Sequence, residues 1–162
     1  MKQYSIFLIL LLTIFACQKE DETPSVKFTQ AEIELIHNGS EKTWRVVEVY
    51  ENYGANRLDE MSACIIDDTY TFYADSADVQ MSLGEVSCYW DSPDEQASVL
   101  AFNYYPEEGT AYLNHGRSES KGSEFAAIIT ILELEELSAS RMMFASGTAG
   151  NWARVLILEA VD

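Results

Sequence analysis

The stretch Thr69-Tyr70-Thr71-Phe72-Tyr73 (TYTFY) alternates threonine with aromatic residues. Successive side chains of an extended strand point to opposite faces, so Tyr70 and Phe72 share one face while Thr71 and Tyr73 share the other. Threonine and aromatic side chains also fit a half-buried pleated surface. The stretch therefore predicts a β-strand that turns one face toward a core.

Runs of the same kind recur along the chain, separated by polar or glycine-containing turns. We expect strands at 43–50, 69–73, 79–83, 85–90, 99–105, 125–134, 141–145 and 152–160. Short strands at even spacing predict an all-β, antiparallel up-and-down meander, and closing it into a barrel of about eight strands would remove its free edges. We expect residues 106–124, with an Asn-His-Gly turn at His115, to be the longest loop.

One short helix precedes the strands. Thr29-Gln30-Ala31-Glu32 has the form of a capping box, in which Thr29 caps the helix and Glu32 reaches back to it. Ile33, Leu35 and Ile36 supply an apolar side, and a glycine at position 39 is a stop signal. These features predict a helix over residues 30–37.

The N-terminus changes abruptly from apolar to charged. Residues 6–15 (IFLILLLTIF) form an apolar run that is too short to span a membrane, which takes about 20 residues, but that fits a secretion signal. Ala16 then precedes Cys17, and residues 13–17 resemble the lipobox of bacterial lipoproteins, with Phe15 where that motif prefers a small residue. The resemblance implies a signal peptide over 1–16 and acyl chains on Cys17 that anchor the protein in a membrane. An ordinary signal peptide is the alternative.

The residues after Cys17 read QKEDETPS, a lysine followed by acidic residues. This pattern resembles the surface-export signal of Bacteroidetes lipoproteins, and the alternative is a solvated spacer. We expect 17–28 to be an acidic disordered tether and 29–162 to be the barrel domain. The expected location is the outer membrane, exposed at the cell surface or otherwise facing the periplasm.

Two further cysteines, Cys64 and Cys88, remain once Cys17 carries lipid. Outside the cytoplasm an even pair indicates a disulfide, which would contribute about 3 kcal/mol in the chain-entropy model. The alternatives are two free thiols, or two metal ligands without evident partners.

A wider pattern connects these features. A helix leads into a strand that starts near Trp44, followed by Cys64-Ile-Ile-Asp67-Asp68, then Thr71-Phe72, Gly84, and Cys88 ahead of Trp90. The pattern resembles the lipocalin-like domains of Bacteroidetes lipoproteins over residues 29–160, and the resemblance implies paired cysteines and a ligand-binding barrel. It departs from true lipocalins in having Lys42 where they carry glycine, and Arg154 matches their final arginine, which packs across the tryptophan, only loosely.

Inward aromatic side chains carry the ligand hypothesis. The side chains that we expect to line a ligand cavity are Trp44, Tyr70, Phe72, Phe102 and Tyr104. A barrel of about eight strands has room either for packed side chains or for one small ligand, so a filled core is the alternative. Tyr89-Trp90 and Tyr104-Tyr105 could alternatively form exposed platforms on which sugars stack.

Charge and composition exclude several functions. The formal net charge of −17 argues against nucleic acid and against anionic lipid surfaces as partners. His37 and His115 are far apart in the sequence, and no catalytic or metal-ligand spacing stands out. We therefore expect no enzyme activity, no cofactor and no metal, and we read Asp67-Asp68 as a turn before the aromatic strand.

Asp75-Ser76-Ala77 resembles the three-residue O-glycosylation motif of exported Bacteroidetes proteins, so Ser76 is a candidate modification site. Two functions remain open. The first is a lipid-anchored binding module for an apolar small molecule or a glycan. The second is a non-catalytic scaffold lipoprotein with a filled core, which acts through its surface in an envelope assembly with a protein partner that the sequence does not identify.

Overall fold

A computed structural model describes residues 26–51, 65–85, 97–121 and 124–161. Cys17, Cys64 and Cys88 lie outside these residues, as do the signal peptide, nearly all of the tether and most of the strand expected at 85–90. Among the residues described, no helix is both long enough and apolar enough to cross a membrane.

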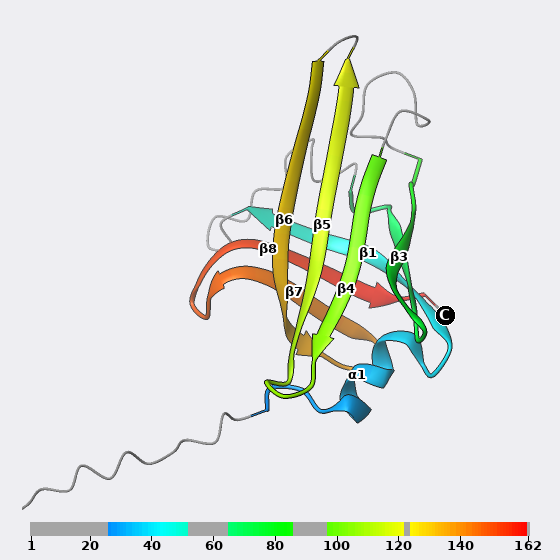
Figure 1. The fold of residues 1–162 in the computed structure, drawn as a ribbon, viewed down its shortest axis with the longest axis vertical. Coiled ribbons are helices and arrows are strands. Elements are labelled where there is room, and N and C mark those ends of the chain that lie inside the picture. The colour runs from blue at the N-terminus through cyan, green and yellow to red at the C-terminus, as the bar shows by residue number, and fades with distance from the viewer. Residues whose placement is uncertain (1–25, 52–64, 86–96, 122–123, 162) are drawn as a thin grey trace, which may run out of the picture.

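The chain forms a closed antiparallel barrel with its strands in sequence order, β1-β2-β3-β4-β5-β6-β7-β8. Figure 1 shows β4, β5 and β6 crossing β7 and β8, with α1 at one end of the barrel. The helix and strands are α1 (Gln30–His37), β1 (Glu41–Glu51), β2 (Thr69–Tyr73), β3 (Ser76–Ser82), β4 (Ala97–Tyr105), β5 (Thr110–Lys121), β6 (Glu124–Leu137), β7 (Arg141–Thr148) and β8 (Asn151–Ala160). The predicted all-β meander barrel with one preceding helix is confirmed.

The helix has the bounds and the cap that the sequence predicted. The Thr29 side chain accepts a hydrogen bond from the Glu32 backbone, and the backbone N–H of Thr29 donates to the Glu32 carboxylate at 2.7 Å. These donors from Thr29 lower the pKa of Glu32 below its usual value. Ile33 and Ile36 are buried, so the apolar side of α1 packs onto the open end of the barrel.

The interior of the barrel is packed with apolar side chains. Phe72 stacks parallel to Phe144 with ring centroids 6.5 Å apart, and Phe102 meets both rings edge-on. Other fully buried side chains of this core are Trp44, Val46, Tyr70, Leu113, Leu132, Leu134, Met142 and Leu158. The inward direction of Tyr70 and Phe72 follows the alternation expected from TYTFY, because Thr71 and Tyr73 are only partly buried.

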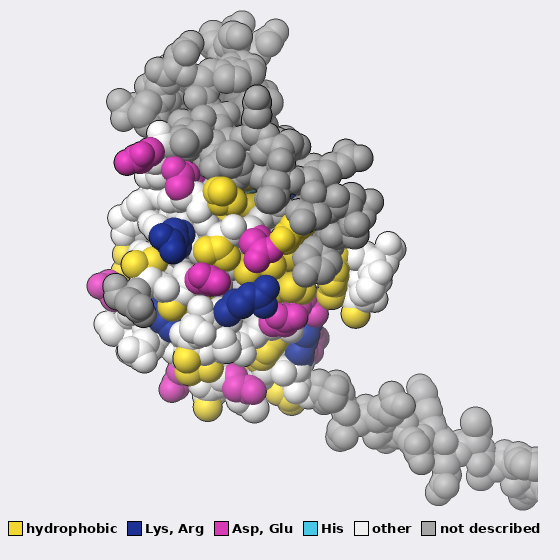
Figure 2. All heavy atoms as spheres, turned by 180° about the vertical axis from the view of Figure 1, so that it is seen from behind, with side chains coloured by type: hydrophobic (Ala, Val, Ile, Leu, Met, Phe, Trp, Pro, Cys, Tyr) yellow, Lys and Arg dark blue, Asp and Glu magenta, His cyan; other side chains and the backbone are white. Residues whose placement is uncertain are grey.

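A second apolar cluster lies on the outward side of the same strands. It consists of Tyr50, Met143, Ala145, Val155 and Ile157, with Val47 and Trp152 packed against it. On β7 and β8 these residues alternate with members of the inner core, which explains why both faces of these two strands are buried. Figure 2 shows hydrophobic side chains among acidic and basic ones on the face opposite to that of Figure 1.

The expected loop at 106–124 is wrong. Residues Thr110–Lys121 form β5, which pairs with β4 from Thr110 to Ser118 and with β6 from Tyr112 to Lys121. His115 is accordingly a buried strand residue and not part of a turn. The sequence of β5 is mostly polar, and its strand structure depends on the two neighbouring strands that it joins.

A cation does lie across Trp44, but it is Lys42. The Lys42 ammonium is 4.2 Å from the centre of the Trp44 ring, and its Nζ donates to the Ala139 carbonyl. Burial lowers the pKa of Lys42 below its usual value. Arg154 pairs with Glu51 in the β1–β8 register, whereas Trp44 pairs with Ala160, so Arg154 lies further along the barrel. Arg154 is therefore not the strand partner of Trp44.

Candidate functional site

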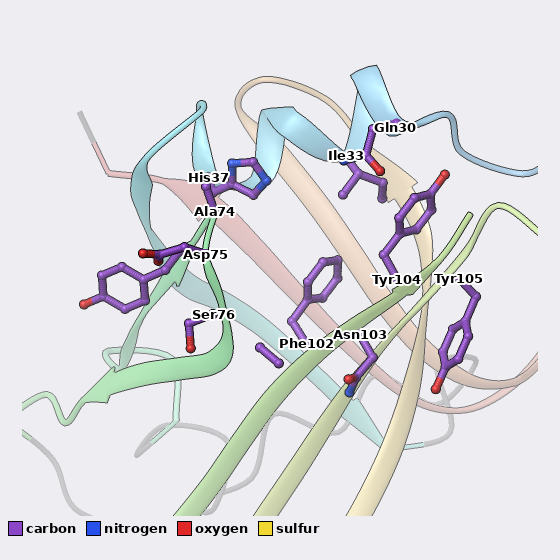
Figure 3. Close-up of a pocket in the computed structure, with 12 residues that line it drawn as sticks. Gln30, Ile33, His37, Ala74, Asp75, Ser76, Phe102, Asn103, Tyr104 and Tyr105 are labelled. Carbon is purple, nitrogen blue, oxygen red and sulfur yellow. The ribbon is translucent and has the colours of Figure 1, made fainter. Parts of the chain in front are cut away.

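A cleft opens where the barrel wall is least continuous. The described residues of β3 and β4 pair in register only at Asp78 and Ala101, whereas β4 pairs with β5 along its whole length. The end of β4, the β2–β3 hairpin and α1 together border this space (Figure 3). The cleft has a volume of about 430 Å³ and is lined by Gln30, Ile33, His37, Tyr73, Ala74, Asp75, Ser76, Ala77, Phe102, Asn103, Tyr104 and Tyr105.

The end of β4 supplies the aromatic side of the cleft. Figure 3 shows Phe102 and Tyr104 pointing toward α1, while Asn103 and Tyr105 point to the other side of the strand. The Phe102 ring joins the cleft to the core, because it also packs edge-on against Phe72 at 5.7 Å. Tyr104 donates its hydroxyl proton to the Phe28 carbonyl at 2.7 Å, which fixes the ring against the entry to the helix.

The helix supplies both apolar and polar groups. Gln30 is exposed at the first position of α1, and Ile33, one turn later, is buried facing the barrel. At the other end of the helix, His37 Nδ1 accepts a hydrogen bond from the Gly39 backbone at 3.2 Å. In the neutral imidazole this leaves the proton on Nε2, so His37 carries an N–H donor on its other ring nitrogen.

The β2–β3 hairpin forms the opposite side. Its turn is held to the residues after α1, because the Ala74 backbone N–H donates to the Ser40 carbonyl at 2.7 Å. Ser76 Oγ accepts from the Asp78 backbone at 3.0 Å, and the side chains of Asp75, Ser76 and Ala77 are exposed. Hydroxyl and carboxylate oxygens therefore lie on this side of the cleft and can accept hydrogen bonds from a ligand.

The described lining of the cleft includes an acidic side chain but no lysine or arginine. Asp75 supplies the carboxylate. Lys27 is engaged elsewhere, with its Nζ at 2.9 Å from Glu133 and 2.7 Å from Glu135. An anionic ligand would therefore find no lysine or arginine partner among these lining residues and would meet the carboxylate of Asp75.

The residues predicted to bind ligand separate into two groups. Trp44, Tyr70 and Phe72 are at most 1% exposed and lie within the packed core. Phe102 and Tyr104 are partly buried and line the cleft. Ser76, the candidate glycosylation site, also lies on the rim of the cleft. The structure thus brings two of the five aromatic residues and Ser76 together.

The interior also contains polar side chains above the apolar core. Tyr70 Oη lies 3.2 Å from His115 Nε2, and both residues are buried. His115 pairs with Thr130 on β6, whose hydroxyl accepts from Arg154 Nη1 at 3.2 Å. One hydrogen bond thus links β2 to β5 through Tyr70 and His115, and another links β6 to β8 through Thr130 and Arg154.

Asp67 and Asp68 precede β2, as the sequence indicated. Asp68 is fully buried and its carboxylate accepts from the Gly84 backbone at 3.2 Å. A Cβ atom at Gly84 would lie only 2.0 Å from the Asp67 carboxyl carbon, so this close approach requires glycine. Within the described ranges, no group of three or more His, Cys, Asp or Glu side chains could hold a metal ion.

Sequence reasoning missed the contributions of Gln30, Ile33 and His37 to the cleft. The local signals at these positions concern the helix itself, namely its cap, its apolar side and its end. Nothing in the spacing indicates that α1 meets the β2–β3 turn and the end of β4. The sequence signals that did fall on the cleft were Phe102 and Tyr104, expected to bind ligand, Tyr105 beside them, and Ser76 on the hairpin.

Comparison of the chain with protein-family models, with curated proteins and with solved structures found no match.

Proposed function

We propose that this protein is a lipid-anchored binding module of a bacterial envelope, and that it binds a small molecule or a glycan in the cleft beside α1. The observation that carries the proposal is the cleft itself, which joins a helix, a hairpin turn and a strand end around about 430 Å³ of space. Small-molecule sites typically occupy roughly 300–1,000 Å³ and combine apolar walls with a few polar groups.

The scaffold suits such a site. Phe102 packs against two rings of the core, and the Tyr104 hydroxyl is fixed by Phe28. A site that is preorganised by a packed scaffold loses little conformational entropy when a ligand binds. The apolar N-terminal run and Cys17 support the lipid anchor, and the acidic residues after Cys17 support export to the cell surface.

A second function, that of a scaffold lipoprotein, is favoured by a different observation. Ile129 and Ile131 on β6 are 70% and 60% exposed, on the side of the strand opposite to the buried Leu132 and Leu134. Two large apolar side chains in adjacent outward positions are a feature of surfaces that bind other proteins. In this alternative the barrel is a rigid core and its outer wall carries the function.

Native mass spectrometry of the full-length protein, extracted from its own membrane, tests the binding module. The wild-type protein is compared with Ala77→Trp, which places a bulky side chain in the cleft, and with Ala153→Trp, which makes the same change at an exposed position of β8. We expect a non-covalent adduct on the wild type and on Ala153→Trp that Ala77→Trp loses. An adduct that all three proteins retain would contradict the cleft as the site. The same spectra read the acyl mass on Cys17.

A further inference from the structure

We infer that the cleft selects a neutral glycan. The inference rests on the proposed function and names the ligand class of the same site. It depends on two observations, namely the aromatic floor at Phe102 with polar groups on both sides, and the absence of lysine and arginine among the described lining residues.

The arrangement of apolar and polar groups matches the two kinds of surface on a sugar ring. A pyranose has faces of C–H groups, which pack on aromatic rings, and an edge of hydroxyl groups, which both donate and accept hydrogen bonds. Figure 3 shows the Phe102 ring in the middle of the cleft, with His37 toward one side and Ile33 and Tyr104 toward the other. A ring stacked on Phe102 would direct its hydroxyl edge toward these flanking groups.

The polar groups of the cleft include both donors and acceptors. His37 offers an N–H on Nε2, Gln30 offers an amide, and Asp75 and Ser76 offer oxygens from the hairpin side. An apolar ligand would cover these groups without replacing their bonds to water, so each group left unsatisfied would weaken its binding. A hydroxylated ligand replaces those bonds and avoids that loss.

The charge of the cleft then restricts the glycan to neutral sugars. Uronic acids and sulfated sugars carry negative charge, and the cleft presents Asp75 with no lysine or arginine among its described residues. Lys42, on the strand that follows α1, donates to the Ala139 carbonyl and lies over the Trp44 ring. The net charge of −17 adds a general repulsion of anions.

The test uses the full-length protein in lipid nanodiscs on an array of neutral, uronate and sulfated oligosaccharides. The apolar fluorophore N-phenyl-1-naphthylamine serves as a separate probe in solution. Wild type, Ala77→Trp and Ala153→Trp are compared with both probes, after thermal unfolding has shown that the two tryptophan variants are equally folded. Ala77 and Ala153 are both exposed alanines on strands, so the second variant controls for the substitution itself.

We expect neutral oligosaccharides to bind the wild type and Ala153→Trp, and Ala77→Trp to lose about tenfold or more in affinity, which corresponds to about 1.4 kcal/mol. Preferential binding of uronate or sulfated oligosaccharides would overturn the inference. Fluorophore binding that only Ala77→Trp abolishes, without any response to glycans, would overturn the inference but leave the proposed function standing. If no probe distinguishes Ala77→Trp from Ala153→Trp, both are wrong.

A variant that reverses the charge of Asp75 tests whether the cleft itself excludes anionic glycans. Asp75→Lys changes an exposed residue at the tip of the hairpin and introduces the cation that the cleft lacks. We expect this variant to gain binding to sulfated oligosaccharides. The matched variant Asp78→Lys, at an exposed position of β3, should gain none, because Asp78 is not among the residues that line the cleft. Equal gains by the two variants would indicate a general charge effect and would contradict selection by the cleft.

Discussion

Phe72 and Phe102 are neighbours in the core, yet their replacement by alanine should have different consequences. Phe72 is 1% exposed and contacts the rings of Phe144 and Phe102, so its removal leaves an enclosed cavity. Such a substitution costs about 3–5 kcal/mol, a large part of the stability of a single domain. Phe102 is only partly buried and borders the cleft. Water can enter the space that it leaves, so its loss should cost about 2 kcal/mol.

Guanidinium unfolding of the full-length protein measures both losses. We expect Phe72→Ala to lower the midpoint strongly and Phe102→Ala to lower it by about half as much, with unchanged slopes. The leucine variants at the same two positions should recover most of the stability. In thermal unfolding, Phe72→Ala should lower the Tm by roughly 10 °C. Equal losses for the two alanine variants, or a larger loss for Phe102→Ala, would refute the division between the core and the cleft.

Four further changes have defined outcomes. Gly109→Ala should destabilise the protein by more than about 1 kcal/mol in chemical denaturation, because its φ is +65° and a Cβ atom would lie 2.4 Å from a Val26 side-chain carbon. Lys27→Met should cost up to about 1 kcal/mol of stability. Burial acts to lower the pKa of Lys27, but hydrogen bonds to two glutamates of β6 raise it overall. The stabilisation by Lys27 is therefore fully present below its ordinary pKa of 10.5, and a pH titration of stability should show it disappear as the pH rises through the folded pKa. Ser76→Ala should remove any sugar mass from a tryptic peptide that covers the hairpin, and a mass loss equal to the missing hydroxyl oxygen alone would contradict modification at this site. Reduction of Cys64 and Cys88 should cost about 3 kcal/mol, and identical unfolding curves with and without reductant would contradict the disulfide.

The fold was largely predictable because its signals are local. The alternation in residues 69–73 gave the direction of the side chains, and the capping box gave helix bounds that the structure repeats. By contrast, β5 was missed because the sequence of Thr110–Lys121 contains few residues that favour strands, and His115 next to Gly116 resembled a turn. This strand forms because β4 and β6 pair with it on both sides, and that is a tertiary effect.

The cleft could not be predicted from the sequence. It joins residues 30–37, 73–77 and 102–105, and it lies beside the β3–β4 edge, where the described residues give one register pair. The inward direction of Phe102 and Tyr104 followed from alternation, but the same pattern fits a filled barrel. The division between Phe72 in the core and Phe102 at the cleft depends on where α1 and the hairpin meet the end of β4.

The most direct test of the central claim is a methyl NMR titration of the full-length protein, labelled at alanine and isoleucine, in nanodiscs. The probes are a pool of neutral oligosaccharides and, separately, N-phenyl-1-naphthylamine. If the cleft is the binding site, one of these probes should shift the methyl signals of Ala74, Ala77 and Ile33, and the signals of Ile129 and Ile131 should not move. Shifts confined to Ile129 and Ile131, or no shift with either probe, would contradict the account.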